Sequence, residues 1–388
     1  MVAYTEYSTD ARIRREAETL ASLSGFDVRL LSLREGPAPR EYEKNGVVIH
    51  ELPIAKYQGK KSTRYILSYL RFMLLAFFKI NQLLLRGALD LVHVHNMPDF
   101  LVFSAIVPRL VGKKLVLDVH DTILETFKVK FGWGANGLLP FVLRLEEKVS
   151  FAIAHRIICV NDVQREALLR RGVPPAKTYV SMNVPDPNLF NGVKEAFATK
   201  DHNRGSFRVV YHGTISKRLS LDVAIRAVVS LRSQIQGLEF HIVGSGDDME
   251  EFERLIRELG AEEMVIFVGN RSLDEIPGIL SEMDVGVVPN DRNPATELML
   301  PVKMMECIAL GIPVVVPRLR AIQHYFSEDM VTYFEAGDPV SLSQALLDLY
   351  EDPEKRHRKT KNALRFLDSH GWQRQKLDFI EFCKGLVN

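Results

Sequence analysis

The chain has 388 residues, of which 46% are hydrophobic, and this is enough material for two well-packed domains. Its 50 lysines and arginines nearly balance its 49 aspartates and glutamates, so the overall charge does not favour a nucleic-acid partner. The three cysteines are far apart and form neither a disulfide framework nor a metal-ligand spacing, which is typical of a reducing cytoplasm. We also expect no secretory leader, because Met1 runs directly into a strand-like segment and a charged helix.

The first half of the chain alternates short apolar strands with helices. This alternation predicts parallel β-α-β units in a doubly wound sheet, and the β-branched strands lack polar alternation, as expected when helices cover both faces. The predicted strands are 2–4, 28–32, 47–51, 91–94, 115–119, 157–160 and 178–181, and the predicted helices are 11–23, 62–86, 99–111, 137–152 and 162–170.

One segment of this half is unusual, because no acidic residue lies between Leu52 and Leu89. Its apolar and aromatic residues predict a helix over 62–86 with little polar circumference, although we find no apolar stretch of the ~20 residues that span a bilayer. One interpretation is a helix buried on a sheet face behind a solvated basic stretch. The other is contact with an anionic membrane surface through Lys56–Arg71. The basic residues of the segment are Lys56, Lys60, Lys61, Arg64, Arg71, Lys79 and Arg86.

The proline- and asparagine-rich stretch 183–191 is typical of an interdomain linker, and the strand–helix rhythm restarts after it. We therefore expect one domain over 1–185 and a second over 186–368. In such sheets a ligand lies beyond the carboxyl ends of the strands, so two facing domains would share one cleft. The predicted strands of the second half are 208–211, 239–243, 265–268, 285–288, 314–316 and 331–334, and the predicted helices are 221–233, 249–259, 274–281, 301–310, 339–350, 353–367 and one after Trp372.

The stretch from Pro294 to Pro317 predicts a short buried helix that carries two charges. Pro301 suits its first turn, and Gly311 suits a left-handed end. Lys303 and Glu306 are three residues apart, so they share one face of an otherwise apolar helix. They could pair with each other or with a neighbour. Alternatively, Lys303 and the helix N-terminus could bind a phosphate while Glu306 accepts hydrogen bonds from sugar hydroxyls.

Several turns that follow predicted strands of the second half carry groups suited to a phosphorylated ligand. Glycines allow close backbone approach, and hydroxyls and cations bind phosphate, although each turn taken alone is also typical of an ordinary solvated βα turn. The GSG at 244–246 lacks the third glycine of the dinucleotide fingerprint. The candidate residues are Gly213, Thr214, Lys217, Arg218, Gly244 and Asn270.

Polar pairs also follow two successive strands of the first half. A histidine at a strand end is usually structural, but two such pairs on the ligand-bearing edge favour a function. Because no third ligand lies near His93 and His95 in the sequence and no Asp-x-Asp pair occurs, we predict no metal site. The candidate residues of this edge are His95, Asn96, His120 and Asp121, together with Asp10 and Arg12, which could instead be a helix N-cap and a solvated arginine.

Taken together and in this order, the segments HNMPDFLVFSAIVPRL, LDVHDTILE, ICVNDVQREALLRRGVPPAK, YHGTISKRLSLDVAIRA and LPVKMMECIALGIPVVV resemble family 4 glycosyltransferases over nearly the whole chain. The resemblance implies the GT-B fold, in which two Rossmann-like, doubly wound parallel-sheet domains face a central cleft. It implies a nucleotide-diphosphate sugar donor held mainly by the second domain, an acceptor held by the first, and a last helix, here 369–388, that crosses back. It also implies transfer with retention of configuration, without a required metal or other cofactor.

Some residues match the family pattern. By this resemblance, Glu306 binds the nucleotide ribose, Gly213 belongs to the diphosphate loop, and His120 approaches the donor sugar. Lys303 is expected to stabilise the leaving diphosphate. The residues that precede the helix, Leu298, Met299 and Leu300, are expected on the donor side.

Other positions depart from the family pattern. The first motif glutamate falls on Leu298, and the nearest acid, Glu297, is one residue too early, although it is a candidate to replace the missing carboxylate. Thr214 and Leu219 stand where the family has an arginine and a lysine, and 8–10 replace a glycine pair. These departures concern the sugar and its contacts more than the fold.

The resemblance predicts a glycosyltransferase of cell-envelope polysaccharide or glycoconjugate synthesis, with a saccharide or a lipid-linked acceptor. One alternative is a non-hydrolysing sugar-nucleotide epimerase, which would need acidic groups beside the sugar. Another is a non-catalytic protein of the same fold, which the departures favour but the retained Lys303, Glu306 and His120 oppose.

Overall fold

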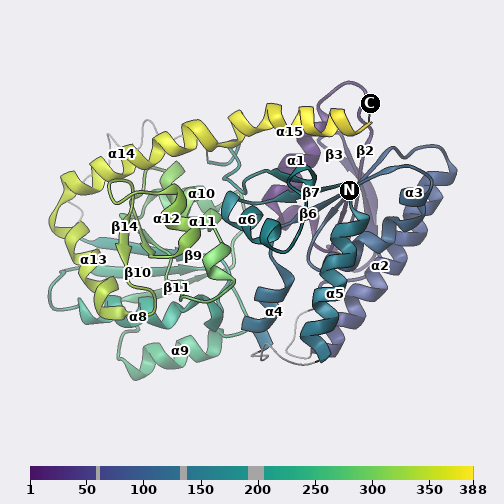
Figure 1. The fold of residues 1–388 in the computed structure, drawn as a ribbon. Coiled ribbons are helices and arrows are strands. Elements are labelled where there is room, and N and C mark those ends of the chain that lie inside the picture. Colours follow the sequence, from purple (N-terminus) through teal and green to yellow (C-terminus); the bar gives the residue numbers. More distant parts are fainter. Residues whose placement is uncertain (58–61, 132–137, 191–204, 388) are drawn as a thin grey trace. The chain divides into compact units, whose positions relative to one another are not determined.

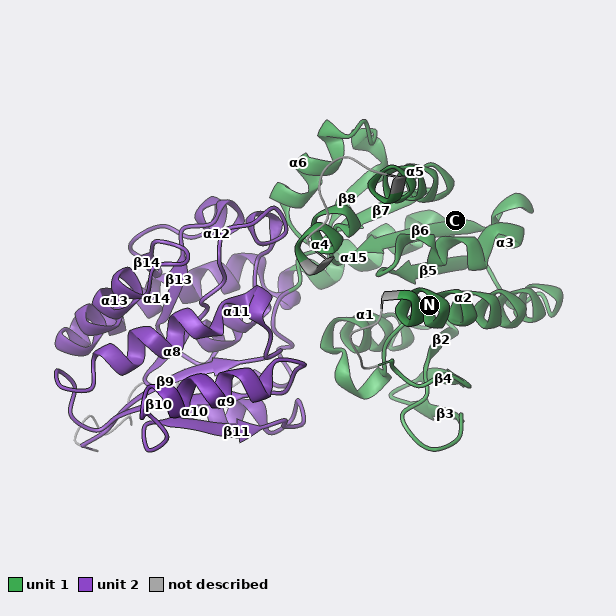
Figure 2. Ribbon diagram, turned by 90° about the horizontal axis from the view of Figure 1, so that it is seen from below, with its two compact units in different colours: residues 1–183, 375–388 green, residues 184–374 purple. Residues whose placement is uncertain are grey.

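The computed structural model describes residues 1–57, 62–131, 138–190 and 205–387. The chain forms two compact units, residues 1–183 with 375–388 (unit 1) and residues 184–374 (unit 2), coloured separately in Figure 2. Each unit is built on a sheet whose strands are mostly parallel, with helices along the chain between them. The predicted fold class of two doubly wound α/β units is confirmed.

Unit 1 has an eight-stranded sheet in the order β3-β4-β2-β1-β5-β6-β7-β8, shown at the right of Figure 1. Only the pairing of β3 with β4 is antiparallel. This edge hairpin was not predicted, although Asn45 and Gly46, with φ of 52° and 79°, form the kind of turn that joins such strands. The strands are β1 (Val2–Ala3), β2 (Val28–Leu33), β3 (Glu41–Lys44), β4 (Val47–Leu52), β5 (Leu91–His95), β6 (Lys114–Val119), β7 (Arg156–Cys159) and β8 (Thr178–Val180).

One core of unit 1 joins the sheet to a layer of helices on one of its faces, and α2, η2, α5 and α6 contribute to it. The predicted helix over 99–111 begins as the 3₁₀ helix η2, and α4 lies in a region predicted as loop. The helices are α1 (Ala11–Ala21), α2 (Ser62–Leu85), η2 (Asp99–Ala105), α3 (Ile106–Leu110), α4 (Ile123–Phe131), α5 (Leu138–Ile153) and α6 (Asp162–Arg170), with short 3₁₀ turns η1 (Tyr7–Thr9) and η3 (Pro175–Lys177).

Unit 2 has a six-stranded sheet in the order β11-β10-β9-β12-β13-β14, with every pairing parallel. Its strands are β9 (Phe207–His212), β10 (Leu238–Val243), β11 (Val265–Gly269), β12 (Val285–Val287), β13 (Val314–Pro317) and β14 (Thr332–Phe334). Its helices are η4 (Lys217–Leu219), α8 (Leu221–Ser230), α9 (Met249–Glu258), α10 (Ile276–Ser281), η5 (Thr296–Leu298), α11 (Val302–Ala309), α12 (Arg320–Tyr325), α13 (Pro339–Glu351) and α14 (Pro353–His370).

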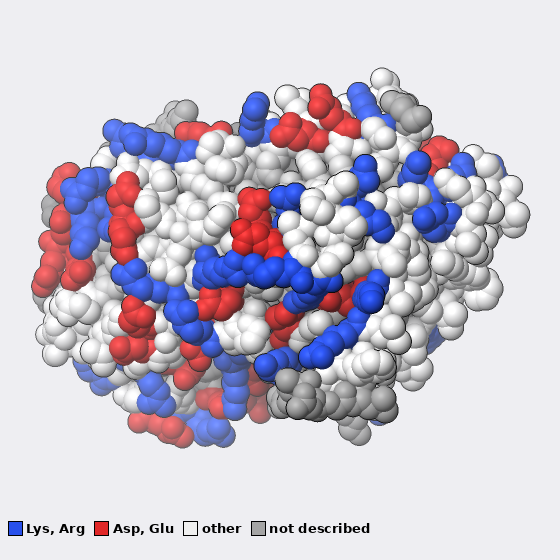
Figure 3. Space-filling view, viewed as in Figure 1, with Lys and Arg blue, Asp and Glu red and all other residues white. Residues whose placement is uncertain are grey.

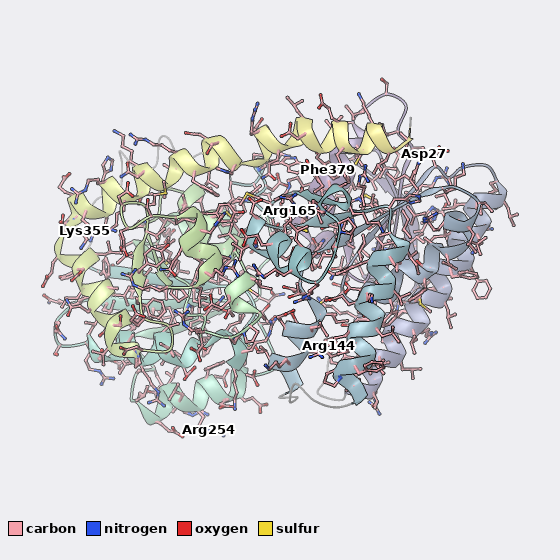
Figure 4. The ribbon with its side chains drawn as sticks, in the orientation of Figure 1. Asp27, Arg144, Arg165, Arg254, Lys355 and Phe379 are labelled. Atoms are coloured by element: carbon pink, nitrogen blue, oxygen red, sulfur yellow. The ribbon has the colours of Figure 1, made fainter. Side chains whose placement is uncertain are left out.

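The last helix, α15 (Trp372–Val387), belongs to unit 1 from Gln375 onward. The Gln375 side-chain oxygen accepts a hydrogen bond from the Met182 backbone at 2.7 Å, and Phe382 stacks on Tyr179 with ring centroids 4.4 Å apart. Phe379, labelled on α15 in Figure 4, is fully buried. The end of the chain is therefore part of the unit 1 core.

The expectation that no apolar stretch is long enough to span a bilayer is corrected by helix α2. Its residues Thr63–Leu85 are long and apolar enough to cross a membrane by length and composition. Only 22% of its most apolar window is buried. However, Phe72, Ala76 and Ile80 are buried in the core of unit 1, so this helix lies on the sheet. In the predicted basic stretch Lys56–Arg71, residues 58–61 lie outside the described residues.

A group of carboxylates lies where α5 meets the rest of unit 1. Arg171 donates to Glu147 at 2.6 Å and also pairs with Glu125, while Asp99 accepts from Asn96 at 2.7 Å. Burial and the nearby Asp99 carboxylate together raise the pKa of Glu146 to about 8. Burial likewise raises the pKa of Glu147 to about 7, against the opposing effect of Arg171. The fold therefore favours the protonated Glu146 side chain.

Glu146→Gln should stabilise the protein at alkaline pH. Because the folded pKa lies above the unfolded value, ionisation of Glu146 costs stability as the pH rises from about 4.5 to about 8. We expect the free energy of unfolding in urea to be similar for both proteins at pH 5 and higher for the variant by roughly 1–2 kcal/mol at pH 8.5. Glu166→Gln on α6, where Glu166 is exposed, is the control and should show no such growth with pH. Equal destabilisation by Glu146→Gln at both pH values would contradict this account.

Candidate functional site

The residues at the two ends of helix α11 determine where it begins and ends. Pro301 is its N-cap with φ −68°, and the helix runs from Val302 to Ala309. Gly311 has φ +71°, a conformation that suits glycine, and its N–H donates to the Ile308 carbonyl at 2.9 Å. The predicted helix and its left-handed end are confirmed.

Lys303 and Glu306 both face the end of β9, as their spacing predicts. The Lys303 Nζ lies 3.1 Å from the Tyr211 hydroxyl and 4.2 Å from the centre of its ring. The Glu306 carboxylate lies 2.7 Å from His212 Nε2, and its side chain is 14% exposed. The two helix charges therefore contact neighbours on β9, and the partner of Lys303 is an uncharged phenol.

Sequence reasoning missed Tyr211 and His212. Both are polar, both end an apolar strand, and both directly precede the glycine loop. Such a pair on adjacent positions sends its side chains to opposite faces of a strand. The sequence does not show that α11 crosses the end of β9, which is what brings both residues into contact with it.

The glycine loop leaves bare backbone beside the Lys303 ammonium. A side chain at Gly213, where φ is +119°, would place its Cβ 3.2 Å from Lys303 Nζ. A Cβ at Gly244, where φ is +142°, would lie 2.0 Å from the Gly213 carbonyl oxygen, and one at Gly246 would lie 1.9 Å from that of Ile215. The turns after β9 and β10 therefore touch backbone to backbone, and only glycine fits there.

Three other predicted donor-side residues have side chains open to solvent. Thr214, Arg218 and Asn270 are exposed. Lys217 is also exposed, but its ammonium pairs with Glu251 at 2.6 Å, and its backbone N–H donates to Asp248. This pairing makes Lys303 the stronger candidate for a phosphate contact, and the expected contact of Lys217 stays a prediction.

The residues before α11 form the short helix η5 and an extended link. Glu297 pairs with Arg292 at 2.5 Å, and its other oxygen accepts from the Arg320 backbone at 2.7 Å. Both oxygens are engaged, so Glu297 joins η5 to α12 in the structure, and its expected catalytic role stays a prediction. Of the link itself, Leu300 is buried, whereas Leu298 and Met299 are half-buried.

In unit 1, a buried ion pair lies under the carboxyl ends of β5 and β6. Both Arg12 Nε and Nη2 donate to the Asp118 carboxylate, at 3.1 and 2.9 Å, and Nη1 donates to the Ser181 carbonyl at 3.0 Å. The Arg12 side chain is 1% exposed. This corrects the expectation that Arg12 faces a ligand, since its guanidinium holds buried backbone and carboxylate groups together.

His120 is the most exposed member of a group of contacting side chains that also contains His95 and Asp118. Its Nε2 lies 3.1 Å from His95 Nδ1 and 3.5 Å from Asp118, and its side chain is 21% exposed, against 2% for His95. Burial lowers the pKa of His120, but the Asp118 carboxylate outweighs burial and raises it above the ordinary value. Burial and His93 lower the pKa of His95 well below that value. His95 therefore supports His120 from beneath, which corrects its expected place among the exposed cleft residues.

Asn96 fixes the loop that carries His120. Its Oδ1 accepts from the His120 backbone N–H at 2.7 Å, and its Nδ2 donates to the Asp121 carbonyl at 2.7 Å. Asp10 caps α1 by accepting from the Ile13 backbone at 3.1 Å. Asn96 and Asp10 thus have structural hydrogen bonds, while the Asp121 residue is half-buried beside His120.

The structure also corrects the reasoning about metal ligands. Glu16 and Asp118 join His93 and His95, and one ligand atom from each lies within 4.8 Å of the others. Arg12, however, contacts both carboxylates, at 3.2 Å from Glu16 and 2.9 Å from Asp118. The guanidinium already supplies the positive charge that these buried acids need.

The fold and this site define a class of protein: two Rossmann-like units, of which the second holds a lysine beside a glycine loop at the carboxyl edge of its sheet. Residues 9–183 match the family described as "Glycosyl transferase 4-like domain", and residues 193–366 match "Glycosyl transferases group 1". The chain belongs to the family 4 glycosyltransferases and has the GT-B fold, as the resemblance implies.

Three known proteins illustrate the similarity. The amylovoran biosynthesis glycosyltransferase AmsK of Erwinia amylovora is 25% identical over 201 residues, which are 51% of this chain and 48% of that protein. The chain thus matches about half the length of this relative. Sucrose-phosphate synthase of Thermosynechococcus elongatus shares the fold with a TM-score of 0.78 and 19% identity, over 99% of this chain and 98% of that one. Anabaena HepE, solved with UDP-glucose, has a TM-score of 0.71 and 15% identity, over 99% and 98% of the chains.

Gly244→Ala should destabilise unit 2, because its Cβ would collide with the Gly213 carbonyl in a backbone conformation that disfavours alanine. We expect a loss of roughly 3 kcal/mol or more in the free energy of unfolding, measured in urea. The control is Gly278→Ala in α10, where a Cβ meets nothing within 4 Å, and it should be neutral or stabilising by about 0.5–1 kcal/mol. Equal stability of the two variants would refute the close packing of the loops.

Proposed function

We propose that the protein transfers a sugar from a nucleotide-diphosphate donor to a saccharide or lipid-linked acceptor, with retention of configuration and without a metal. One observation carries the proposal: the Lys303 ammonium lies against the bare backbone of Gly213 and next to an uncharged partner, Tyr211. An ammonium in this setting keeps donors for an anion. The nearby N-terminus of α11 favours the same charge.

In the proposed reaction, the bond between the sugar and the diphosphate breaks as the acceptor hydroxyl attacks from the same face, and the hydroxyl proton passes to the departing diphosphate oxygen. Negative charge develops on the departing diphosphate, and Lys303 and the α11 N-terminus stabilise it. Arg218, which is exposed close to the loop in sequence, is the second candidate cation. In unit 1, His120 contributes the contact to the donor sugar, because the raised pKa favours its protonated, donating form.

Glu306 is proposed to accept hydrogen bonds from the two ribose hydroxyls. Its carboxylate is 14% exposed, and one oxygen is fixed by His212. A carboxylate held this way is oriented before the ligand arrives, which lowers the entropic cost of binding. The other candidate acid, Glu297, pairs with Arg292 and the Arg320 backbone, which supports a transferase over an epimerase that needs two acidic groups beside the sugar.

The relatives support the class of substrate. HepE was solved with UDP-glucose and AmsK is named for amylovoran biosynthesis, so we propose a nucleotide-sugar donor and a role in polysaccharide or glycoconjugate synthesis. We further propose that the protein acts in the cytoplasm, at the inner face of a membrane. The basic stretch Lys56–Arg71 is the contact that its sequence suggests.

Lys303→Ala should lower turnover by roughly 10²–10³-fold, the usual cost of removing one group that stabilises developing negative charge. The measurement is release of nucleoside diphosphate from the preferred donor at saturating acceptor. The control is Lys217→Ala, because the Lys217 ammonium is already paired with Glu251, and it should change turnover by less than about threefold. Near-normal turnover of Lys303→Ala would remove Lys303 from the reaction.

Glu306→Ala should weaken nucleotide binding by about tenfold or more, because the ribose loses charge-assisted hydrogen bonds. A thermal-shift screen of the wild type with UDP, GDP, ADP and their sugars first identifies the preferred ligand, since a bound ligand must stabilise the fold. Calorimetry with that ligand then compares the variant. Unchanged affinity in a variant with normal unliganded stability would exclude Glu306 from the site, and no shift with any nucleotide would overturn the proposed donor class.

A further inference from the structure

The exposed apolar side chains are concentrated on one layer of unit 1. Among the residues that the structure describes, seventeen large apolar side chains are exposed, and thirteen of them belong to α2, α3 with the residue after it, and α5. We call these thirteen residues the outer face. They are Ile66, Leu67, Leu70, Leu74, Phe78, Leu85, Leu110, Val111, Leu139, Phe141, Val142, Leu145 and Val149. Exposed apolar residues that gather in this way mark a site of contact.

Helix α2 carries two apolar stripes on opposite sides. Its inner stripe is buried in the core and contains Phe72, Ala76 and Ile80. Its outer stripe recurs at spacings of three, four, four and seven residues, which keeps it on one side of a helix. The outer stripe is Leu67, Leu70, Leu74, Phe78 and Leu85, exposed by 67, 39, 52, 67 and 88%. A helix that lies on a sheet in water needs only the first stripe.

Helix α5 is turned the opposite way from an ordinary surface helix. Phe141, Leu145 and Val149 recur every four residues and are exposed by 62, 51 and 36%. The two acidic residues of the same helix, Glu146 and Glu147, lie inward, where burial raises the pKa of both. Water outside would favour the reverse arrangement, with carboxylates outward and the phenylalanine inward. The arrangement suits contact of the outward side of α5 with an apolar surface.

Other helices of the protein expose charged side chains where the outer face exposes apolar ones. Helix α6 contributes to the same core, yet its exterior carries the exposed ion pair of Glu166 with Arg170. In unit 2, the exterior of α9 carries the pair of Arg254 with Glu258. The surface over α2, α3 and α5, at the right of Figure 3, is mostly uncharged, with basic side chains among it.

The charges around the outer face select its partner. Helix α2 contains no acidic residue, while Arg64 and Arg71 are exposed on it. On α5, Lys148 is exposed next to the apolar stripe, and Arg144 is labelled on the same helix in Figure 4. A second copy of this face would bring like charges together. An anionic lipid surface instead offers both phosphate groups and an apolar layer.

We propose that the outer face of α2, α3 and α5 rests on an anionic bilayer, with its apolar side chains among the lipid headgroups and upper acyl chains. Helix α2 then lies along the membrane instead of crossing it, because its inner stripe holds it to the sheet. The inference deepens the proposed function by naming the surface that brings the enzyme to a lipid-linked acceptor, and for that acceptor it rests on the proposed function. It extends the contact from the part of Lys56–Arg71 that lies on α2 to the whole layer of α2, α3 and α5.

Flotation of the full-length protein with phosphatidylcholine vesicles that contain about one-third phosphatidylglycerol tests the proposal. We expect the wild type to bind these vesicles and to bind pure phosphatidylcholine at least about tenfold more weakly. The double variants Leu67→Ser with Phe78→Ser on α2, and Phe141→Ser with Leu145→Ser on α5, should each lower the partition coefficient by about tenfold or more. Arg71→Glu with Lys148→Glu should do the same for the anionic vesicles alone.

A matched control changes two apolar residues that are equally exposed elsewhere, Val340→Ser with Leu377→Ser, exposed by 74 and 62%. This control should change the partition coefficient by less than about twofold. Unfolding midpoints of all variants should match the wild type, because every substituted side chain is exposed.

Three outcomes would overturn the inference: no binding of the wild type to the anionic vesicles, equal losses in the control, or a wild-type dimer that the outer-face variants abolish, since that would assign the face to a second copy. The thermal shift with nucleotides is measured on the same samples. Vesicle binding without a nucleotide shift would reject the proposed donor and leave the membrane contact standing, and the reverse result would reject the contact alone.

Discussion

The candidate site depends on the way one positive charge is held at the end of β9. An ammonium on a buried helix needs a partner, and here the partner is the Tyr211 hydroxyl, which itself donates to the Thr214 carbonyl at 2.5 Å. The hydroxyl proton is thus committed to Thr214, and its lone pair faces the Lys303 Nζ. The ring adds a cation–π contact at 4.2 Å. Because neither contact neutralises the lysine, its charge stays available to an anion beside Gly213.

A comparison with Arg12 shows why this arrangement indicates function. Arg12 is also a cation on a helix at the carboxyl edge of a parallel sheet, but it meets two carboxylates, Asp118 and Glu16. Its charge is compensated inside the fold, as buried charges usually are. Asp118 in turn raises the pKa of His120, the most exposed member of that group. A compensated cation stabilises a unit, whereas a cation held by a phenol and bare backbone is prepared for a ligand.

Much of the fold could be predicted because local signals agree with tertiary structure. The helix over 162–170 was predicted at both ends, and its start is fixed by Asn161, whose side chain accepts from the Gln164 backbone at 2.7 Å. The site was harder, because hydrogen-bond partners come from distant elements. Glu297 is close to the family position in sequence, yet Arg292 and the Arg320 backbone engage it. His212 meets Glu306 of α11 across 94 positions of the chain, and no local pattern indicates this contact.

The sequence also leaves the role of helix 62–86 open, because it does not show which side of the helix meets the rest of the protein. A helix that is apolar around most of its circumference has no single stripe that periodicity can assign to the core, so burial and lipid contact predict the same pattern. The structure separates the two stripes: Phe72 and Ile80 reach the sheet, while Leu67 and Phe78 do not. The inward glutamates of α5 are informative as well, because a helix that turns Glu146 and Glu147 inward and exposes Phe141 leaves apolar area in water that contact with another surface would bury. An apolar, anionic surface supplies both the lost apolar burial and the counter-charge for the exposed lysine and arginines, and water supplies neither.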